Sequence, residues 1–207
     1  MMQSQLNPHF LYNTLDTMKW VAKANHIPEI ATLAAKLAKI LRTSISSAQF
    51  ITLREEMTLV ESYAKIQKIR FNGKFDFRYE IAPETEEILV PKLIVQPIVE
   101  NAVIHGMAEK IRIRVDAGKH WVRFSVSDNG AGIPQEKLEH LCGDYMELAD
   151  TSSGDKKHNM GIGLIVCRDI IKVHGGNFEG RNQLEGGTEF WFTLPLKEER
   201  QYGGHKG

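Results

Sequence analysis

The sequence predicts an α+β protein in which a helical first third is followed by a mixed sheet with helices on one face. Apolar residues recur at every third or fourth position up to about residue 71, as they do in amphipathic helices. After Gly73 they alternate with polar residues in several short stretches, as in half-buried strands. Helical patterns lie between those stretches, so strands and helices should pack as the two layers of an α+β sandwich.

The first third predicts a helical hairpin. Its first apolar stripe consists of Leu11, Leu15, Met18 and Ala22. A break at residues 25–28 precedes a second stripe over residues 30–45. Asn7 fits an N-cap and Pro8 the first helical position, although Pro8 would equally kink a longer helix that arrives from upstream. Two such helices leave apolar surface uncovered, so we expect a homodimer in which two hairpins form a four-helix bundle.

A third helix is predicted to begin after Thr52, which forms a capping box with Glu55, and to run to about Phe71. The pair Asn72-Gly73 then stops it, and the period of the pattern changes. We therefore place the domain boundary here, with a helical dimerisation domain over residues 1–72 and a second domain over residues 73–207.

Strands of the second part are predicted over residues 75–81, 111–115, 122–126 and 190–194, with one more strand before the last. A helix is expected over residues 91–105, with Pro91 at its first position and a bend or break at Pro97. Another covers residues 163–173. Residues 134–160 are too long for an ordinary connection, so we interpret them as a mobile lid whose first part packs as a short helix. The alternative is a disordered insertion.

Composition excludes several classes of function. Lys and Arg number 26, as do Asp and Glu, so no net charge draws the chain to nucleic acid or to an anionic membrane. Cys142 and Cys167, without CxxC spacing, indicate a reduced cytoplasmic setting without a disulfide or a zinc site. No apolar run has the length of a membrane span. A dense motif stands almost at the start, so we expect a fragment whose membrane attachment, if any, lies in a missing upstream region.

Polar residues interrupt the apolar helix predicted over residues 91–105. Glu100, Asn101 and His105 stand out, and Asn101 and His105 are four apart, on one side of the helix. An amide beside an imidazole suits a metal-bound phosphate. The alternative is a core helix whose Asn and His satisfy nearby backbone groups.

Three glycine motifs follow. In Asp128-Asn129-Gly130-Ala131-Gly132 the glycines allow close approach to a flat ligand, and Asp128 is suited to accept from the amine of adenine, although Asp-Asn-Gly is also a common turn. Gly161-Ile162-Gly163-Leu164 directly precedes a helix and forms an anion cradle for phosphates. Gly186-Gly187-Thr188 suits the start of a tight hairpin, with Thr188 available to the base pocket.

In this order, the motifs of residues 74–196 resemble the GHKL ATP-binding domain, whose fold is the Bergerat α/β sandwich, shared by gyrase, mismatch-repair proteins, heat-shock chaperones and sensor histidine kinases. The resemblance implies ATP as ligand, with Mg²⁺ held by Asn101, adenine by Asp128, and phosphates by the loop at Gly161, Gly163 and Leu164. It extends the proposed cofactor-binding set to His105, Gly130, Gly132 and Thr188.

The first third, with LNPHFLYNTL and TLREEMTLVESYAKIQKIRF, resembles the LytS/YesM-type sensor histidine kinases of bacterial two-component systems, whose phosphoacceptor matches His9. The resemblance implies autophosphorylation of His9 by ATP, transfer to an aspartate of a response regulator, and a cytoplasmic place within a membrane sensor protein. A nucleotide-gated interaction module and a GHKL ATPase without phosphotransfer are the alternatives.

The chain departs from many histidine kinases next to the acceptor, where Phe10 replaces an acidic residue. Glu100 is therefore the candidate base, although it would equally position water, as the matching residue does in GHKL ATPases. Asn13, one turn after His9, is a candidate for aligning the water that dephosphorylates the regulator, or it simply faces solvent. Pro97 stands where many kinases have a second Asn, and the usual Phe-rich box of the lid is absent.

Overall fold

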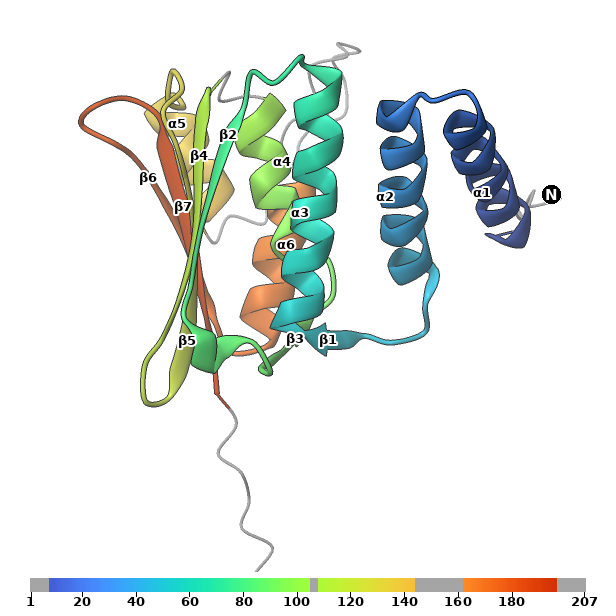
Figure 1. Cartoon of the computed structure of the whole chain (residues 1–207). Helices are drawn as coiled ribbons and strands as arrows, with labels where there is room; N and C mark the ends of the chain where they lie inside the picture. The colour runs from blue at the N-terminus through green and yellow to red at the C-terminus, as the bar shows by residue number, and fades with distance from the viewer. Residues whose placement is uncertain (1–7, 105–107, 144–161, 197–207) are drawn as a thin grey trace, which may run out of the picture.

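The structure is a computed structural model of the 207-residue chain and describes residues 8–104, 108–143 and 162–196. The predicted fold class is confirmed, because a helical hairpin is followed by a five-stranded mixed sheet with helices on one face (Figure 1). Within the described residues, no helix is both long and apolar enough to cross a membrane.

Helices α1 (Pro8–Ala24) and α2 (Pro28–Ile45) form the predicted hairpin and pack along each other. Their buried side chains are alanines: Ala22, Ala31, Ala34 and Ala38. Larger apolar side chains stay exposed on the two helices, among them Phe10, Trp20, Val21 and Leu37. The hairpin thus leaves apolar surface uncovered, as predicted, while the pairing of two hairpins stays a prediction. The proposed N-cap, Asn7, lies outside the described residues.

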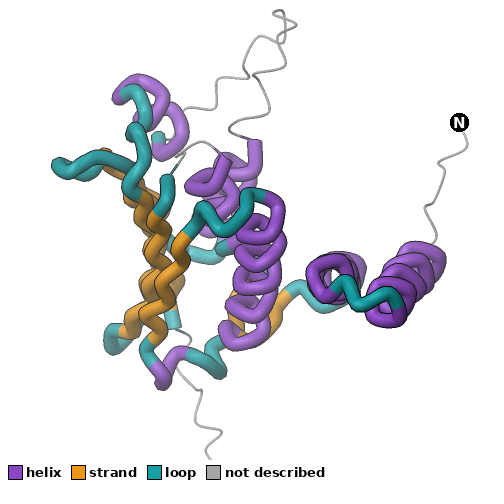
Figure 2. The backbone as a smooth tube through the Cα atoms, turned by 45° about the horizontal axis from the view of Figure 1, so that its top comes forward, coloured by secondary structure: helices purple, strands orange, loops and turns teal. Residues whose placement is uncertain are grey.

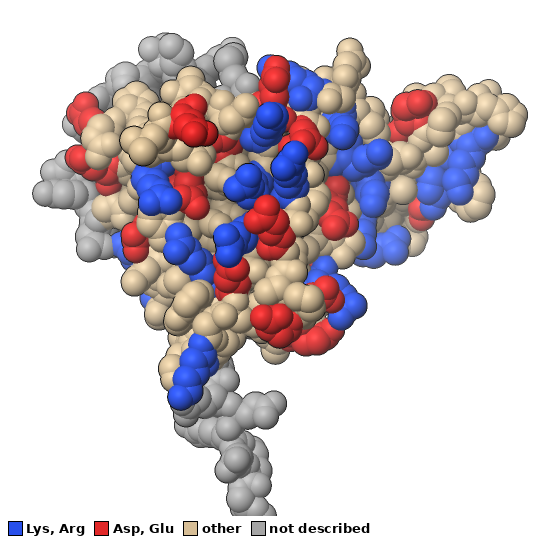
Figure 3. Space-filling view, turned by 60° about the vertical axis from the view of Figure 1, so that its left-hand side comes forward, with Lys and Arg blue, Asp and Glu red and all other residues tan. Residues whose placement is uncertain are grey.

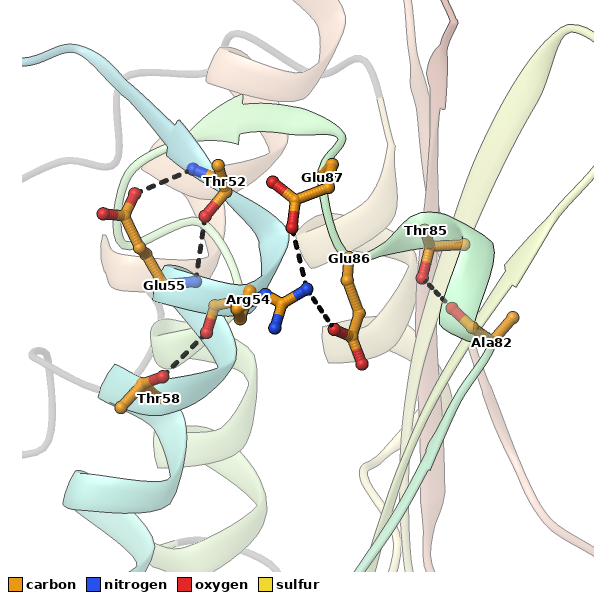
Figure 4. Close-up of polar contacts among 8 residues, drawn as sticks. All are labelled: Thr52, Arg54, Glu55, Thr58, Ala82, Thr85, Glu86 and Glu87. Atoms are coloured by element: carbon orange, nitrogen blue, oxygen red, sulfur yellow. Dashed lines mark hydrogen bonds and ion pairs between the residues drawn. The ribbon is translucent and has the colours of Figure 1, made fainter.

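A short strand connects the hairpin to the rest of the chain. Strand β1 (Phe50–Thr52) pairs antiparallel with β3 (Leu89–Pro91) and leads directly into α3 (Leu53–Arg70). The predicted capping box is confirmed, because Thr52 Oγ1 accepts from the Glu55 N–H at 3.2 Å and Glu55 Oε2 accepts from the Thr52 N–H at 3.0 Å (Figure 4).

Arg54, in the first turn of α3, fixes this helix to the segment before β3. Its Nη2 lies 2.8 Å from a carboxylate oxygen of Glu86 and 2.8 Å from one of Glu87 (Figure 4). The one-turn helix η1 (Pro83–Thr85) precedes these two glutamates. The start of α3 is therefore held by backbone pairing and by ion pairs at once.

The larger sheet has the strand order β2-β4-β5-β7-β6. Its strands are β2 (Asp76–Ile81), β4 (Lys110–Ala117), β5 (Trp121–Asp128), β6 (Asn177–Asn182) and β7 (Thr188–Pro195). Strands β2 and β4 are parallel, and the other neighbouring pairs are antiparallel. The central strand β5 ends at Asp128, so this residue lies near the middle of the sheet at the end where β5 stops.

Helices α3, α4 (Gln96–Ile104) and α6 (Ile162–Val173) cover one face of this sheet (Figures 1 and 2). The core between the layers includes Phe124 and Phe192, whose stacked rings have centroids 4.6 Å apart. The opposite face carries interspersed positive and negative side chains (Figure 3), with ion pairs such as Arg114–Asp116 at 2.8 Å. One face is therefore the core face and the other the solvent face, as alternating strands require.

The prediction that Pro91 begins a helix was wrong. Pro91 ends β3, where it pairs with Phe50, and α4 begins only at Gln96. Pro97 is then the second residue of the helix, where its missing N–H costs no intrahelical bond, so no bend is needed. The short helix expected in the first part of the lid is confirmed as α5 (Gln135–Cys142), while residues 144–161 lie outside the described residues.

Helix α3 shares its core with the sheet. Leu53, Met57, Val60 and Tyr63 belong to the same cluster of buried residues as the strands. The division at residues 72 and 73 stays a prediction, and this packing shows that α3 is held against the second part.

Candidate functional site

Asp128, the residue predicted to contact adenine, lies at the end of β5 with 5% of its surface exposed. Its Oδ1 accepts a hydrogen bond from the Gly130 N–H at 2.8 Å, and the Thr188 N–H also bonds to the carboxylate. Burial raises the pKa of Asp128 above its ordinary value, while these two donors act in the opposite direction. A carboxylate has lone pairs beyond those two bonds, so it can still accept from an exocyclic amine.

The start of β7 fits closely against Asp128. Gly187 has a φ of +86°, and a Cβ there would clash with the Asp128 carbonyl oxygen. The same carbonyl accepts a hydrogen bond from Gln183 Nε2 at 2.7 Å. The structure therefore brings Asp128 and Thr188 together, as the sequence predicted for the base pocket, and glycine at position 187 is a steric requirement.

The second glycine turn is fixed from β6. Asn182 Oδ1 accepts from the Ile133 N–H at 2.9 Å, and its Nδ2 donates to the Ile133 carbonyl at 2.7 Å. Gly132, just before it, has a φ of +79°. One amide side chain thus holds both backbone groups of the residue that follows the turn.

Helix α4 contacts both β5 and α6, and it carries the predicted metal ligand. Asn101 is buried, with 8% exposed, whereas Glu100 beside it is exposed. A Cβ added at Gly163 would lie 3.5 Å from the Pro97 Cβ, so the first turn of α6 lies against the first turn of α4. Pro97 and Asn101 share one side of α4, so Asn101 lies one turn further along the side that meets the start of α6.

The start of α6 forms the described part of the predicted phosphate cradle. Gly163 is exposed there and Leu164 is buried in the core. The first N–H groups of a helix have no intrahelical partner, and together with the helix dipole they favour an anion at such an end. His105 and Gly161, which were predicted to line the same region, lie outside the described residues.

The residues present fit Mg²⁺ held jointly by protein and nucleotide. Among residues 8–104, 108–143 and 162–196, no group of three or more His, Cys, Asp or Glu side chains is placed to hold a metal ion. Mg²⁺ commonly uses one or two protein oxygens, several waters and substrate phosphates. The amide oxygen of Asn101, one turn along α4 from the proline that meets the start of α6, is suited to be such a ligand.

The predicted phosphoacceptor lies apart from these groups. His9 is exposed in the first described turn of α1, and its Nδ1 lies 3.2 Å from Asn13 Nδ2. Helix α1 packs on α2, and α2 in turn packs on α3 (Figures 1 and 2). The fold therefore joins His9 with Asn13, but it does not bring them to Asn101 or Asp128 within this arrangement of the chain.

Sequence reasoning missed a buried carboxylate next to the site. Glu56 on α3 is fully buried, and its two oxygens accept from the N–H groups of Leu93, at 2.7 Å, and Val95, at 2.9 Å, just before α4. Burial raises the pKa of Glu56 to about 7, although the backbone donors favour the charged form. The sequence contained one indication that Glu56 is buried, because this residue falls within the apolar stripe that contains Leu53, Met57 and Val60.

Two family profiles together match most of the chain. The profile described as histidine kinase-, DNA gyrase B-, and HSP90-like ATPase matches residues 87–198, and the histidine kinase profile matches residues 1–75. Sensor histidine kinase YesM of Bacillus subtilis (strain 168) is 34% identical over 96% of this chain and 33% of YesM. Sensor protein LytS of Bacillus cereus is 29% identical over 97% of this chain and 34% of LytS.

Solved structures agree with these relatives. The nucleotide-free catalytic domain of histidine kinase ThkA is 27% identical, with a TM-score of 0.53, and the match covers 70% of this chain and 94% of that one. The chain spans about a third of the length of the curated relatives it matches. It belongs to the family of histidine kinase-, DNA gyrase B- and HSP90-like ATPases, and within it the chain is related to the YesM- and LytS-type sensor histidine kinases.

Proposed function

We propose that this chain binds ATP with Mg²⁺, phosphorylates His9, and passes the phosphoryl group to an aspartate of a response regulator. The observation that carries the proposal is the pairing of two features in one chain. An exposed imidazole stands on a helical hairpin, and the sheet part carries a buried carboxylate, a buried amide and the N-terminus of α6. The relatives are sensor histidine kinases, which supports the same pairing.

Asn13 is suited to prepare His9 for attack. In the structure the Asn13 Nδ2 faces His9 Nδ1 at 3.2 Å; a flip of the amide would turn its oxygen toward Nδ1, so that Nδ1 holds the proton and Nε2 presents its lone pair. Nε2 then forms a bond to the γ-phosphorus in line as the bond to the bridging oxygen breaks, and ADP leaves. Bound Mg²⁺ supplies charge neutralisation at the phosphates. Glu100, exposed beside Asn101, is the proposed acceptor for a proton released at the site.

The position of α1 sets a condition on this transfer. Because α2 and α3 stand between α1 and α4 in Figure 1, His9 reaches the nucleotide either after a movement of the hairpin or across a dimer. Mixing His9→Gln, which retains the nucleotide site, with Asn101→Asp, which retains the acceptor, distinguishes these routes. Label on the Asn101→Asp chain requires transfer across the dimer.

The direct test is incubation of the chain with Mg²⁺ and γ-labelled ATP. We expect acid-labile, base-stable phosphate on the protein, lost in His9→Gln and kept in His26→Gln, which changes an exposed histidine of the α1–α2 turn. Label that persists in His9→Gln would contradict the site. Release of free phosphate without labelled protein would instead favour an ATPase, and nucleotide binding without turnover a nucleotide-gated interaction module.

The remaining features of the proposal concern assembly. The apolar side chains exposed on α1 and α2 support pairing of two hairpins in a homodimer. From the resemblance to YesM and LytS, of which the chain spans about a third, we also propose that it is the cytoplasmic part of a membrane sensor. Sedimentation of the purified chain tests the dimer.

A further inference from the structure

The turn at residues 92–95 follows β3 and leads into α4, and in space it also contacts the C-terminal end of α2. Three elements hold it besides its own strand. Glu56 on α3 accepts from two of its N–H groups, and Cys167 Sγ on α6 donates to the Ile94 carbonyl at 3.1 Å. On the other side, Lys92 Nζ donates to the carbonyls of Ser44, at 3.1 Å, and Ser46, at 2.6 Å, at the end of α2.

The contact made by Lys92 is a helix cap supplied from a distant segment. The last carbonyls of a helix have no intrahelical partner, and a cation there also interacts favourably with the helix dipole. Lys92 Nζ additionally lies 3.4 Å from the Thr43 carbonyl. The backbone N–H of Lys92 donates to the Gln49 carbonyl at 3.0 Å, which fixes the linker after α2 to the same turn.

The contact made by Glu56 is unusually restrictive. Leu93 adopts a φ of +60°, which costs a residue with a side chain energy and persists only where the surroundings impose it. A carboxylate that spans the N–H groups on both sides of Ile94 imposes this conformation. Glutamine cannot do the same, because its NH₂ group would face one of those donors.

We propose that the turn at residues 92–95, clamped by Glu56 and attached to the end of α2 by Lys92, positions α4 with Asn101 and transmits displacements of α2 to it. This inference rests on the proposed function, since it assumes that Asn101 serves the nucleotide. Glu56 is a positioning residue that acts through the backbone before α4. By linkage, nucleotide bound at α4 must in turn stabilise the contact between Lys92 and α2.

The first test measures binding of the ATP analogue AMP-PNP with Mg²⁺ to the full chain at pH 8. Glu56→Gln should raise the dissociation constant about tenfold at a temperature where the variant is fully folded, because its NH₂ group faces a buried N–H donor and the turn before α4 loses its fixed position. The midpoint of thermal unfolding is measured alongside. Glu61→Gln, an exposed glutamate on the same helix, is the matched control and should change neither quantity. A purely structural role for Glu56 would lower the unfolding midpoint without weakening binding to the folded chain.

The second test follows hydrogen–deuterium exchange at residues 43–46 with and without AMP-PNP. Bound AMP-PNP should slow exchange there in the wild type and in Lys119→Met, an exposed lysine of the β4–β5 turn, but not in Lys92→Met. The inference is overturned if Glu56→Gln binds AMP-PNP as the wild type does, or if Lys92→Met keeps the nucleotide-dependent protection. A wild-type chain that binds no AMP-PNP refutes the proposed function itself, and this inference with it.

Discussion

The buried carboxylate of Glu56 should make the stability of the fold depend on pH in a direction that can be checked. Burial raises its pKa from 4.5 to about 7 in the folded chain. Between these values the folded state keeps a proton that the unfolded state has released, so the free energy of unfolding falls as pH rises. The stabilisation is complete below pH 4.5 and is lost as pH rises through about 7. The gap between the two pKa values corresponds to about 3 kcal/mol.

The assay is urea denaturation, followed by circular dichroism, at pH 5, 6, 7 and 8, the last three spanning roughly one unit on either side of the folded pKa. The difference in the free energy of unfolding between the wild type and Glu56→Gln, taken at each pH, gives the contribution of the Glu56 carboxyl alone. Glutamine does not titrate, and other carboxyls, such as Asp128, are common to both chains. Cys167, the thiol that interacts electrostatically with Glu56, has its pKa raised by burial and stays protonated in this range. The same pH dependence in both chains, or a wild type that gains stability with pH relative to the variant, would refute the reasoning.

Three further substitutions test local features by urea denaturation. Thr52→Ala removes the acceptor for the Glu55 N–H and should cost about 1 kcal/mol, whereas no loss would mean that the capping box adds nothing. Phe192→Ala empties a fully buried site beside Phe124 and should cost about 3 to 5 kcal/mol, and a loss below 1 kcal/mol would argue against this core. Gly187→Ala places a methyl group against the Asp128 carbonyl and should cost at least about 1 kcal/mol and weaken AMP-PNP binding, so wild-type values for both would contradict the described fit.

Local chemistry made part of the fold predictable. The capping box of Thr52 and Glu55 and the stop at Asn72-Gly73 involve residues within a few positions of each other, so the sequence contains the whole interaction. Pro91 shows the limit of such reasoning. A proline suits the first turn of a helix and the end of a strand equally, and only its pairing with Phe50, far away in the chain, decides between them.

The candidate site was also predictable only in part. The glycine motifs were sufficient to assign Asp128 and Thr188 to one predicted base pocket. The reason that they meet comes from the structure, because β5 ends at Asp128 and its neighbour β7 begins at Thr188. The role of Glu56 was not predictable from spacing, because its acceptor groups meet N–H donors 37 and 39 residues further along the chain. The sequence shows a charged residue among apolar positions of a helix, but it does not show which backbone groups that residue accepts from.

The alanines buried in the hairpin have a mechanical consequence. Small side chains let α1 lie close against α2, and the Tyr12 hydroxyl of α1 donates to the Leu41 carbonyl of α2 at 3.3 Å, which couples the two helices. At the C-terminal end of α2, Lys92 Nζ donates to the carbonyl groups of Ser44 and Ser46. A pull applied at the start of α1 would therefore be shared with α2, and it would arrive at a fixed point of attachment on the sheet part.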